Sequence, residues 1–235
     1  RRSSPRPCKD VLLVDEPARA EYLPSDPPEY AADFLLHRYT ISYSPSLSVL
    51  KSTEVAPSAR AEIAIFANPF TSAAYTSRMR SQRGWRFDAL PYAEEEARTI
   101  RNLFGARATV FLREQATKSA FFEQAGASRI LHFATHAFAD PTFDAFSGLV
   151  MATTRDTTDD GLLMGYELAG LHLSAELVTL SACETGHGQL VSGEGVLGLP
   201  RLFLGAGARS VLMTRWVIDD AFASTLLPAF YQYYL

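Results

Sequence analysis

The sequence has few cysteines, no long apolar run and no cluster of basic residues. Its 235 residues include 2 cysteines, and a low cysteine content is typical of proteins from reducing compartments. We therefore expect free thiols and a cytoplasmic location. No apolar stretch approaches the roughly 18 residues of a membrane span, and the formal net charge of −4 comes without the basic patch that nucleic acids require. The composition thus disfavours a membrane or a nucleic acid as a partner.

The length predicts one sizeable domain, and the ends predict that it belongs to a larger protein. A chain of this size buries roughly 70–75% of the surface that it exposes when unfolded, so its core needs neither disulfides nor a metal. The sequence does not begin with Met, and residues 231–235 end inside a predicted helix without a Gly or Asn cap. These features indicate that both ends are cut.

The first 90 residues carry mainly strand signals. Residues 1–9 are expected to form a tail, and strands are expected over residues 11–14 and 39–43. Residues 62–67 are apolar and stop at an Asn-Pro dipeptide, which predicts a buried strand closed by a turn. Residues 71–88 have little apolar periodicity, so we expect a mobile or inserted loop there.

From about residue 90 the pattern alternates between helices and strands, which is the signature of an α/β sheet. A first helix is expected over residues 94–104, with three glutamates in its first turn and Gly105 at its end. Thr117 is expected to cap a helix that runs to about Ala125. The pattern also predicts strands over residues 109–112, 130–134, 177–181 and 210–214, and helices over residues 166–171 and 199–204 and after Asp219.

Two of these strands lead into residues that are suited to acyl transfer. His136 follows the strand at 130–134, Cys183 follows the strand at 177–181, and ligands of open α/β sheets bind at the carboxyl ends of the strands. The separation of 47 residues is similar to that of caspases, whose histidine lies about 50 residues before the cysteine. The histidine would help to form the reactive thiolate and protonate the leaving amine. The backbone N–H groups of Cys183 and Ala137 would hold the oxyanion.

Several segments together resemble the CHAT family of caspase-like cysteine peptidases, which is related to separase. They are residues 132–136, 180–186, 193–198 and 215–220, and the resemblance extends to residues 38–43 and 90–96. It covers nearly the whole chain from about residue 10.

The resemblance implies a caspase-like three-layer α/β sandwich, with a mostly parallel central sheet flanked by helices and a smaller N-terminal region that carries extra strands. Residues 10–89 would form a pseudo-caspase-like subregion and residues 90–235 the catalytic one. Family membership implies that Cys183 and His136 cleave protein substrates without a metal or organic cofactor. Such domains commonly follow helical repeats, so a regulatory domain or partner of the tetratricopeptide (TPR-like) kind is expected.

The resemblance also implies where the substrate binds. In separase-like relatives an acidic residue shortly after the tryptophan lines the pocket for the residue before the scissile bond. Asp220 matches this position best, Asp219 adjoins it, and Glu184 beside the nucleophile is counted with them as substrate-binding. A carboxylate there would favour Arg or Lys in the substrate. Alternatively, either aspartate is the N-cap of the helix that follows.

The chain departs from the family pattern at three positions. The family usually has Gly after the catalytic histidine, where Ala137 stands, and Ala is less favourable if this position needs a positive φ. Arg215 replaces the usual Leu before the tryptophan, which would alter the substrate cleft. Pro200 predicts that its helix starts near Leu199, because proline is tolerated only in the first turn.

Two other functions remain open. A catalytically silent member of the family would serve as an interaction or regulatory module. A nucleotide-binding domain is the other alternative, because Gly193, Gly195 and Gly198 match the spacing of the dinucleotide fingerprint. That fingerprint should directly follow its strand, and here it does not.

A zinc site at His132 and His136 is disfavoured. The zinc-protease motif has Glu after its first histidine, and Phe133 stands at that position. We expect His132 to pack or hydrogen-bond in the core, or to support the dyad.

Overall fold

The computed structural model describes residues 61–83, 85, 87, 90–140, 142–153, 159–181, 195–214 and 218–235. The chain divides into two compact units, residues 1–50 and 51–235, and all of the described residues belong to the second. The predicted tail and the strands at residues 11–14 and 39–43 lie outside the described residues. Within the described ranges, no helix combines the length and the apolar character needed to cross a membrane.

A five-stranded parallel sheet forms the centre of the described unit. Its strand order is β2-β1-β3-β7-β8, and every neighbouring pair is parallel. The strands are β1 (Ala61–Ala67), β2 (Ala108–Leu112), β3 (Ser128–Ala134), β7 (Leu177–Leu180) and β8 (Val211–Met213). The predicted mostly parallel α/β sheet is thereby confirmed. Because β1 lies between β2 and β3, the sheet uses residues from both sides of position 89; the predicted domain boundary there stays a prediction.

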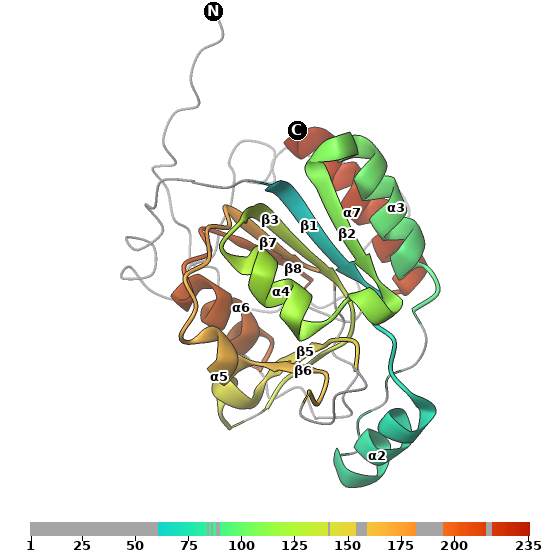
Figure 1. Cartoon of the computed structure of the whole chain (residues 1–235), viewed down its shortest axis with the longest axis vertical. Coiled ribbons are helices and arrows are strands. Elements are labelled where there is room, and N and C mark those ends of the chain that lie inside the picture. The colour runs from blue at the N-terminus through green and yellow to red at the C-terminus, as the bar shows by residue number, and fades with distance from the viewer. Residues whose placement is uncertain are drawn as a thin grey trace, which may run out of the picture. The chain divides into compact units, whose positions relative to one another are not determined.

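Helices cover both faces of this sheet, as Figure 1 shows: α3 and α7 lie together on one face, and α4 and α6 lie on the other. Successive residues of a strand point to opposite faces. In β3, Ile130 therefore packs toward α3 and α7, while Leu131 packs toward α4 and α6. These helices are α3 (Ala93–Phe104), α4 (Lys118–Ala125), α6 (Gly195–Gly205) and α7 (Asp220–Tyr234). The result is the three-layer arrangement that the family resemblance implies.

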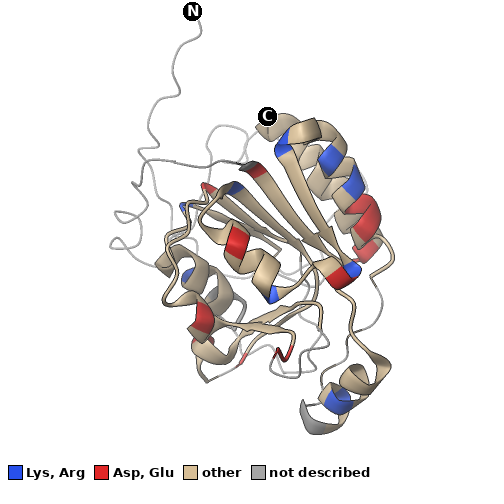
Figure 2. Ribbon diagram, viewed as in Figure 1, with Lys and Arg blue, Asp and Glu red and all other residues tan. Residues whose placement is uncertain are grey.

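Local signals in the sequence account for the ends of α3 and α4. The first turn of α3 contains three acidic residues and its last turn contains Arg101, so its charges complement the helix dipole (Figure 2). Gly105 has φ 59° and ends the helix. A 3₁₀ turn, η3 (Gly105–Arg107), then leads into β2. The Thr117 hydroxyl accepts a hydrogen bond from the N–H of Ala120, which confirms Thr117 as the cap of α4.

A second sheet of three short antiparallel strands was not predicted. It consists of β4 (Ala137–Phe138), β5 (Gly148–Val150) and β6 (Leu162–Met164), in that order. In Figure 1, β5 and β6 lie beyond the carboxyl ends of the main strands. The 3₁₀ turn η5 (Asp144–Phe146) and the helix α5 (Gly165–Leu168) adjoin it. Strands of two or three residues are too short to show a periodic pattern in the sequence.

The loop predicted over residues 71–88 is wrong for most of its length. Helix α2 (Ala73–Arg83) occupies this segment. Among the helix residues whose burial is described, Tyr75 and Met79 are buried; they are four residues apart and pack with Phe87 and Phe138. One such i, i+4 pair gives only a weak apolar periodicity in the sequence.

The predicted start of α6 at Leu199 is also wrong. The helix begins at Gly195, and Pro200 lies inside it. A proline within a helix removes one backbone hydrogen bond, and here the packing of Leu199 and Phe203 into the core compensates for that loss. Gly198 lies close to the Asp144 side chain: an added Cβ would lie 2.4 Å from its carboxylate, so Asp144 would have to move.

Glu94 joins the ends of β1 and β2 to helix α3. Its carboxylate accepts hydrogen bonds from the Asn68 amide (2.9 Å), the Arg113 guanidinium (2.5 Å) and Arg98 (3.0 Å). Arg113 lies in the 3₁₀ turn η4 (Arg113–Gln115). Asn68 and Arg113 both have positive φ, 45° and 49°, so their bonds to Glu94 help to hold two unfavourable backbone conformations.

The ionisation of Glu94 should therefore stabilise the fold. Burial opposes its charged form, but the hydrogen bonds from Asn68 and Arg113 and the charges of both arginines outweigh burial and hold the pKa of Glu94 below its usual value. A carboxyl group whose pKa is lowered by folding stabilises the protein above its unfolded pKa, and this contribution disappears as the pH falls through the folded pKa.

We predict that Glu94→Gln lowers the free energy of unfolding by about 1 kcal/mol at pH 7, a modest value because both arginines are largely exposed. Urea denaturation over a series of pH values measures this difference. It should shrink in acid, and Glu95→Gln, at the exposed neighbouring position, is the matched control. A loss that is the same at every pH would contradict the role of the Glu94 charge.

Candidate active site

His136 lies at the carboxyl end of the central strand β3, two residues after it ends. The residue is buried, with 6% of its surface exposed. Its backbone carbonyl accepts a hydrogen bond from the N–H of Val150 at 2.8 Å, and its ring packs against Phe87 with 5.5 Å between the ring centroids. The small sheet therefore fixes the backbone of His136, and an aromatic side chain fixes the ring.

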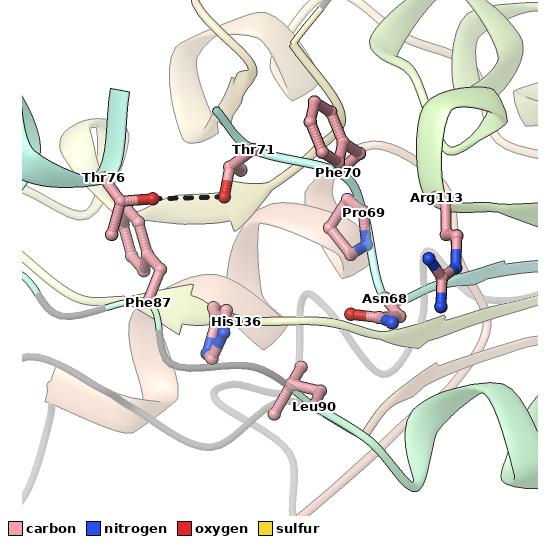
Figure 3. Close-up of a pocket in the computed structure, with 9 residues that line it drawn as sticks. All are labelled: Asn68, Pro69, Phe70, Thr71, Thr76, Phe87, Leu90, Arg113 and His136. Atoms are coloured by element: carbon pink, nitrogen blue, oxygen red, sulfur yellow. Dashed lines mark hydrogen bonds between the residues drawn. The ribbon is translucent and has the colours of Figure 1, made fainter. Parts of the chain in front are cut away.

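A cavity of about 340 Å³ adjoins the His136 ring. Figure 3 shows its wall, which comes from the residues after β1, from Phe87 and Leu90, and from Arg113 after β2. Pro69, Phe70, Phe87 and Leu90 supply apolar surface, and the hydroxyls of Thr71 and Thr76 lie 3.3 Å apart. The histidine thus borders a hollow at the carboxyl edge of the sheet, where α/β proteins bind ligands.

Ala137 begins β4 and presents its N–H group away from β5. Ala137 is paired with Leu149, and the N–H of Val150 bonds to the carbonyl of His136. In an antiparallel pair this pattern marks Ala137 and Leu149 as a non-hydrogen-bonded pair, whose N–H groups point away from the partner strand. The small sheet therefore does not use the Ala137 N–H group.

The strand that leads to Cys183 is the direct neighbour of the strand that leads to His136. β3 and β7 pair in parallel, from Ile130 with Leu177 to Phe133 with Leu180. The N–H of Ser181 continues the pairing with a bond of 2.8 Å to the carbonyl of Phe133. Each pair in this register is 47 residues apart, which is also the separation of His136 and Cys183. Cys183 and Glu184 themselves lie outside the described residues, as do Arg215 and Gly193.

The two aspartates at the start of α7 have different partners. Asp219 is the N-cap, and its side chain accepts hydrogen bonds from the N–H groups of Ala221 and Phe222. The Asp220 carboxylate instead accepts a bond of 2.9 Å from the N–H of Tyr92, at the start of α3. The capping alternative is therefore confirmed for Asp219, while Asp220 links the N-termini of α3 and α7.

Asp220 carries its charge in an unfavourable setting. Burial raises the pKa of Asp220, and the nearby charges of Glu96 and Asp219 raise it further, against the opposing effect of the hydrogen bond from Tyr92. Among the residues that the structure describes, no lysine, arginine or histidine forms an ion pair with Asp220.

His132 belongs to a buried polar network that the sequence analysis did not identify. Its Nε2 lies 2.8 Å from the Glu96 carboxylate and its Nδ1 lies 3.1 Å from the Tyr231 hydroxyl. Both ring nitrogens are thus occupied, which argues against a zinc site at His132, and the described residues contain no metal-binding group of three or more His, Cys, Asp or Glu. Glu96 falls within the apolar face of α3 that Ala93, Ala97 and Ile100 form. This position in the sequence could have indicated that Glu96 is buried and needs polar partners.

The structure also disfavours the dinucleotide-binding alternative. Residues 181–194 separate the end of β7 from the start of α6, and Gly195 and Gly198 lie inside that helix. A dinucleotide fingerprint needs these glycines in the tight turn between strand and helix.

Comparison with known proteins agrees with the resemblance. The family model described as "CHAT domain" matches residues 13–235. The chain is 26% identical over 240 residues to tetratricopeptide repeat protein 28 of Mus musculus, and 25% identical over 240 residues to the protein of the same name from Homo sapiens. Each match covers 85% of this chain and 9% of the relative, so the chain spans about a tenth of the length of these proteins.

The raised pKa of Asp220 leads to a prediction about stability. When folding raises the pKa of a carboxyl group, the group stabilises the folded state at a pH below the pKa that it has in the unfolded chain. This stabilisation is lost as the pH rises through the pKa that it has in the folded state. Asp220→Asn keeps an acceptor for the Tyr92 N–H and removes the charge. We therefore expect the free energy of unfolding of this variant to equal or exceed that of the wild type at pH 7, and the difference to vanish in acid.

Denaturant unfolding at several pH values tests this expectation. Asp219→Asn is the matched control, because it removes a charge from the exposed cap, where the helix dipole favours a negative group; we expect a small loss of stability. If Asp220→Asn were less stable than the wild type at pH 7, the ionised Asp220 carboxylate would be stabilising. That result would contradict a pKa of Asp220 that is raised by folding.

Proposed function

The chain belongs to the CHAT domain family, which has a caspase-like fold, and we propose that it is a cysteine endopeptidase with Cys183 and His136 as its catalytic dyad. The observation that carries this proposal is the parallel register of β3 and β7. Its constant offset of 47 residues matches the separation of the two dyad residues, and the ends of parallel neighbouring strands meet at one edge of a sheet.

The chemistry of the dyad follows from this placement. The Cys183 thiolate attacks the peptide carbonyl, and the carbon–nitrogen bond breaks as His136 protonates the leaving amine. This step leaves a thioester, which water hydrolyses to the acid and the free thiol. The orientation of the Ala137 N–H away from β5 supports its role, with the N–H of Cys183, in binding the oxyanion, an interaction worth about 2.7–4 kcal/mol per donor. No metal or organic cofactor takes part.

The charge of Asp220 supports a peptide substrate with a basic residue before the scissile bond. Asp220 is partly buried and lies near Glu96 and Asp219, which raise its pKa. A guanidinium or ammonium group that docks there would relieve this repulsion and form a charge-assisted hydrogen bond. Asp219, which caps α7, and Glu184, next to the nucleophile, would contribute negative charge to the same region.

The context of the relatives supports control by helical repeats. Both are named as tetratricopeptide repeat proteins, and the chain matches only 9% of their length. We therefore propose that a segment or partner built from such repeats regulates the peptidase.

Substitution of the dyad tests the peptidase function. We expect Cys183→Ala and His136→Ala to reduce cleavage of a peptide library with Arg or Lys before the scissile bond at least about a thousandfold. Cys8→Ala and His172→Ala replace the other cysteine and an exposed histidine, and they should cleave like the wild type. Cleavage that survives Cys183→Ala would contradict the mechanism.

A second readout separates the peptidase from a silent regulatory module. The rate at which iodoacetamide alkylates Cys183, followed by peptide mass spectrometry, should exceed that of Cys8 and should fall in His136→Ala, because the thiolate is the reactive form. A wild type that neither cleaves peptides nor shows this dependence on His136 would support the silent alternative.

Specificity provides a separate prediction. Asp220→Asn should lower kcat/KM for peptides with Arg or Lys before the scissile bond by about 10- to 100-fold, the range for one lost hydrogen bond to a charged group. The kcat/KM for matched peptides with norleucine at that position should change little. An equal loss for both kinds of peptide would contradict the assignment of Asp220 to the specificity pocket.

A further inference from the structure

We propose that Glu96 is a positioning residue for the catalytic dyad: held by His132, its carboxylate fixes Ser181 and thereby the end of β7 that leads to Cys183. This inference rests on the proposed peptidase function and extends it to residues that do not touch the substrate.

The network around Glu96 joins four elements of the described unit. Glu96 on α3 is 1% exposed, and His132 on β3, Thr179 on β7 and Tyr231 on α7 are fully buried. His132 bonds to Glu96 and Tyr231, at 2.8 and 3.1 Å, and the Tyr231 hydroxyl donates to Thr179 at 2.7 Å. The Ser181 hydroxyl donates to the second oxygen of Glu96 at 3.1 Å. One chain of hydrogen bonds therefore crosses from helix to strand to helix beneath the site.

Both ring nitrogens of His132 have partners in this network. Burial is the largest of the causes that raise the pKa of Tyr231 above its usual value, so the phenol is neutral and donates its one proton to Thr179. The Nε2 of His132 lies within hydrogen-bond distance of the Glu96 carboxylate, and its Nδ1 lies within hydrogen-bond distance of the Tyr231 oxygen. The His132 ring is therefore held on both sides, and the Glu96 carboxylate is bound by His132 and Ser181.

This buried network is better explained by positioning than by stability. Buried polar groups are often no more stabilising than well-packed apolar residues of similar volume, whereas their hydrogen bonds hold them in a defined geometry. Here the geometry includes both strands of the proposed dyad, since His132 is on β3 and Ser181 directly follows β7. The Ser181 backbone is also bound to Phe133, so Ser181 is held from two directions at the last described position before Cys183.

Substitution of Ser181 gives the sharpest test, because it breaks the link to Glu96 and leaves the contact between Glu96 and His132 intact. Glu96→Gln is the obvious variant, but it changes a buried partner of both His132 and Ser181 and risks unfolding the chain. We expect Ser181→Ala to lower both kcat and the alkylation rate of Cys183 on the order of tenfold to a hundredfold, as a displaced catalytic group does. KM should not change, and Tm should stay within about 4 °C of the wild type.

Two further variants complete the experiment. Ser181→Thr retains the hydroxyl and should restore kcat and the alkylation rate. Glu95→Gln removes a carboxylate from the exposed side of α3, next to Glu96, and should behave as the wild type in both assays.

The outcomes distinguish this inference from the proposed function. If the wild type shows His136-dependent alkylation and peptide cleavage but Ser181→Ala matches it, the positioning role is overturned and the peptidase stands. A loss that Ser181→Thr does not restore would assign the effect to packing and also overturn the role. If the wild type shows neither activity nor dependence on His136, the proposed function fails, and the positioning role fails with it.

Discussion

The parallel pairing of β3 with β7 is the constraint on which the rest of the site depends. A crossover of 40 or so residues separates the two strands along the chain, yet their backbones are bonded in one register from Ile130 to Phe133. A shift of this register by one residue would turn every side chain of the strand to the other face. It would then place Thr179 and Ser181 away from α3 and α7, so the buried network exists only in the observed pairing.

The two faces of the sheet carry different side chains because of this register. Toward α4 and α6 the central residues of the strands are apolar; they include Phe66 and Phe133, whose rings stack with a centroid distance of 5.3 Å. Toward α3 and α7 the apolar side chains of β3 are interrupted by His132, which is fully buried. A buried polar group is unfavourable unless it is hydrogen-bonded, so His132 depends on its partners Glu96 and Tyr231.

The sequence predicts the parts of this molecule whose signals are local and repeated. The strands at the centre of the sheet are continuous apolar runs, α3 has acidic residues at its start and Gly105 at its end, and Thr117 caps α4. These elements could be predicted because each depends on its own residues. The spacing of His136 and Cys183 could likewise be related to one strand–crossover–strand unit. The order and register of the strands were not predicted, because they depend on pairing between distant segments.

The remaining features depend on contacts between distant segments. Tyr75 and Met79 hold helix α2 against Phe138, which lies in the small sheet. The sequence of α2 has no periodic apolar pattern that would predict a helix. The start of α6 at Gly195 depends on the packing of Leu199 and Phe203, which outweighs the local preference of Pro200. The burial of Glu96 results from three partners on other elements, and the sequence alone indicates only a favourable first turn for α3. The sequence therefore predicts the two strands that lead to His136 and Cys183, but not the buried network of Glu96, Tyr231 and Ser181.

The carboxylates near the N-termini of α3 and α7 show how charge is distributed around the site. Glu94 is paired with Arg98 and Arg113, and Glu96 has hydrogen-bond partners in His132 and Ser181. Asp220 lies close to both helix N-termini, but in the described part of the chain its hydrogen bond comes from a backbone N–H group rather than a cation. Among the carboxylates that are at least partly buried there, Glu94 and Glu96 thus have side-chain partners, whereas the Asp220 carboxylate has a backbone donor. A basic side chain that reached Asp220 would supply a positive charge beside a carboxylate whose pKa is raised by burial and by the neighbouring charges of Glu96 and Asp219.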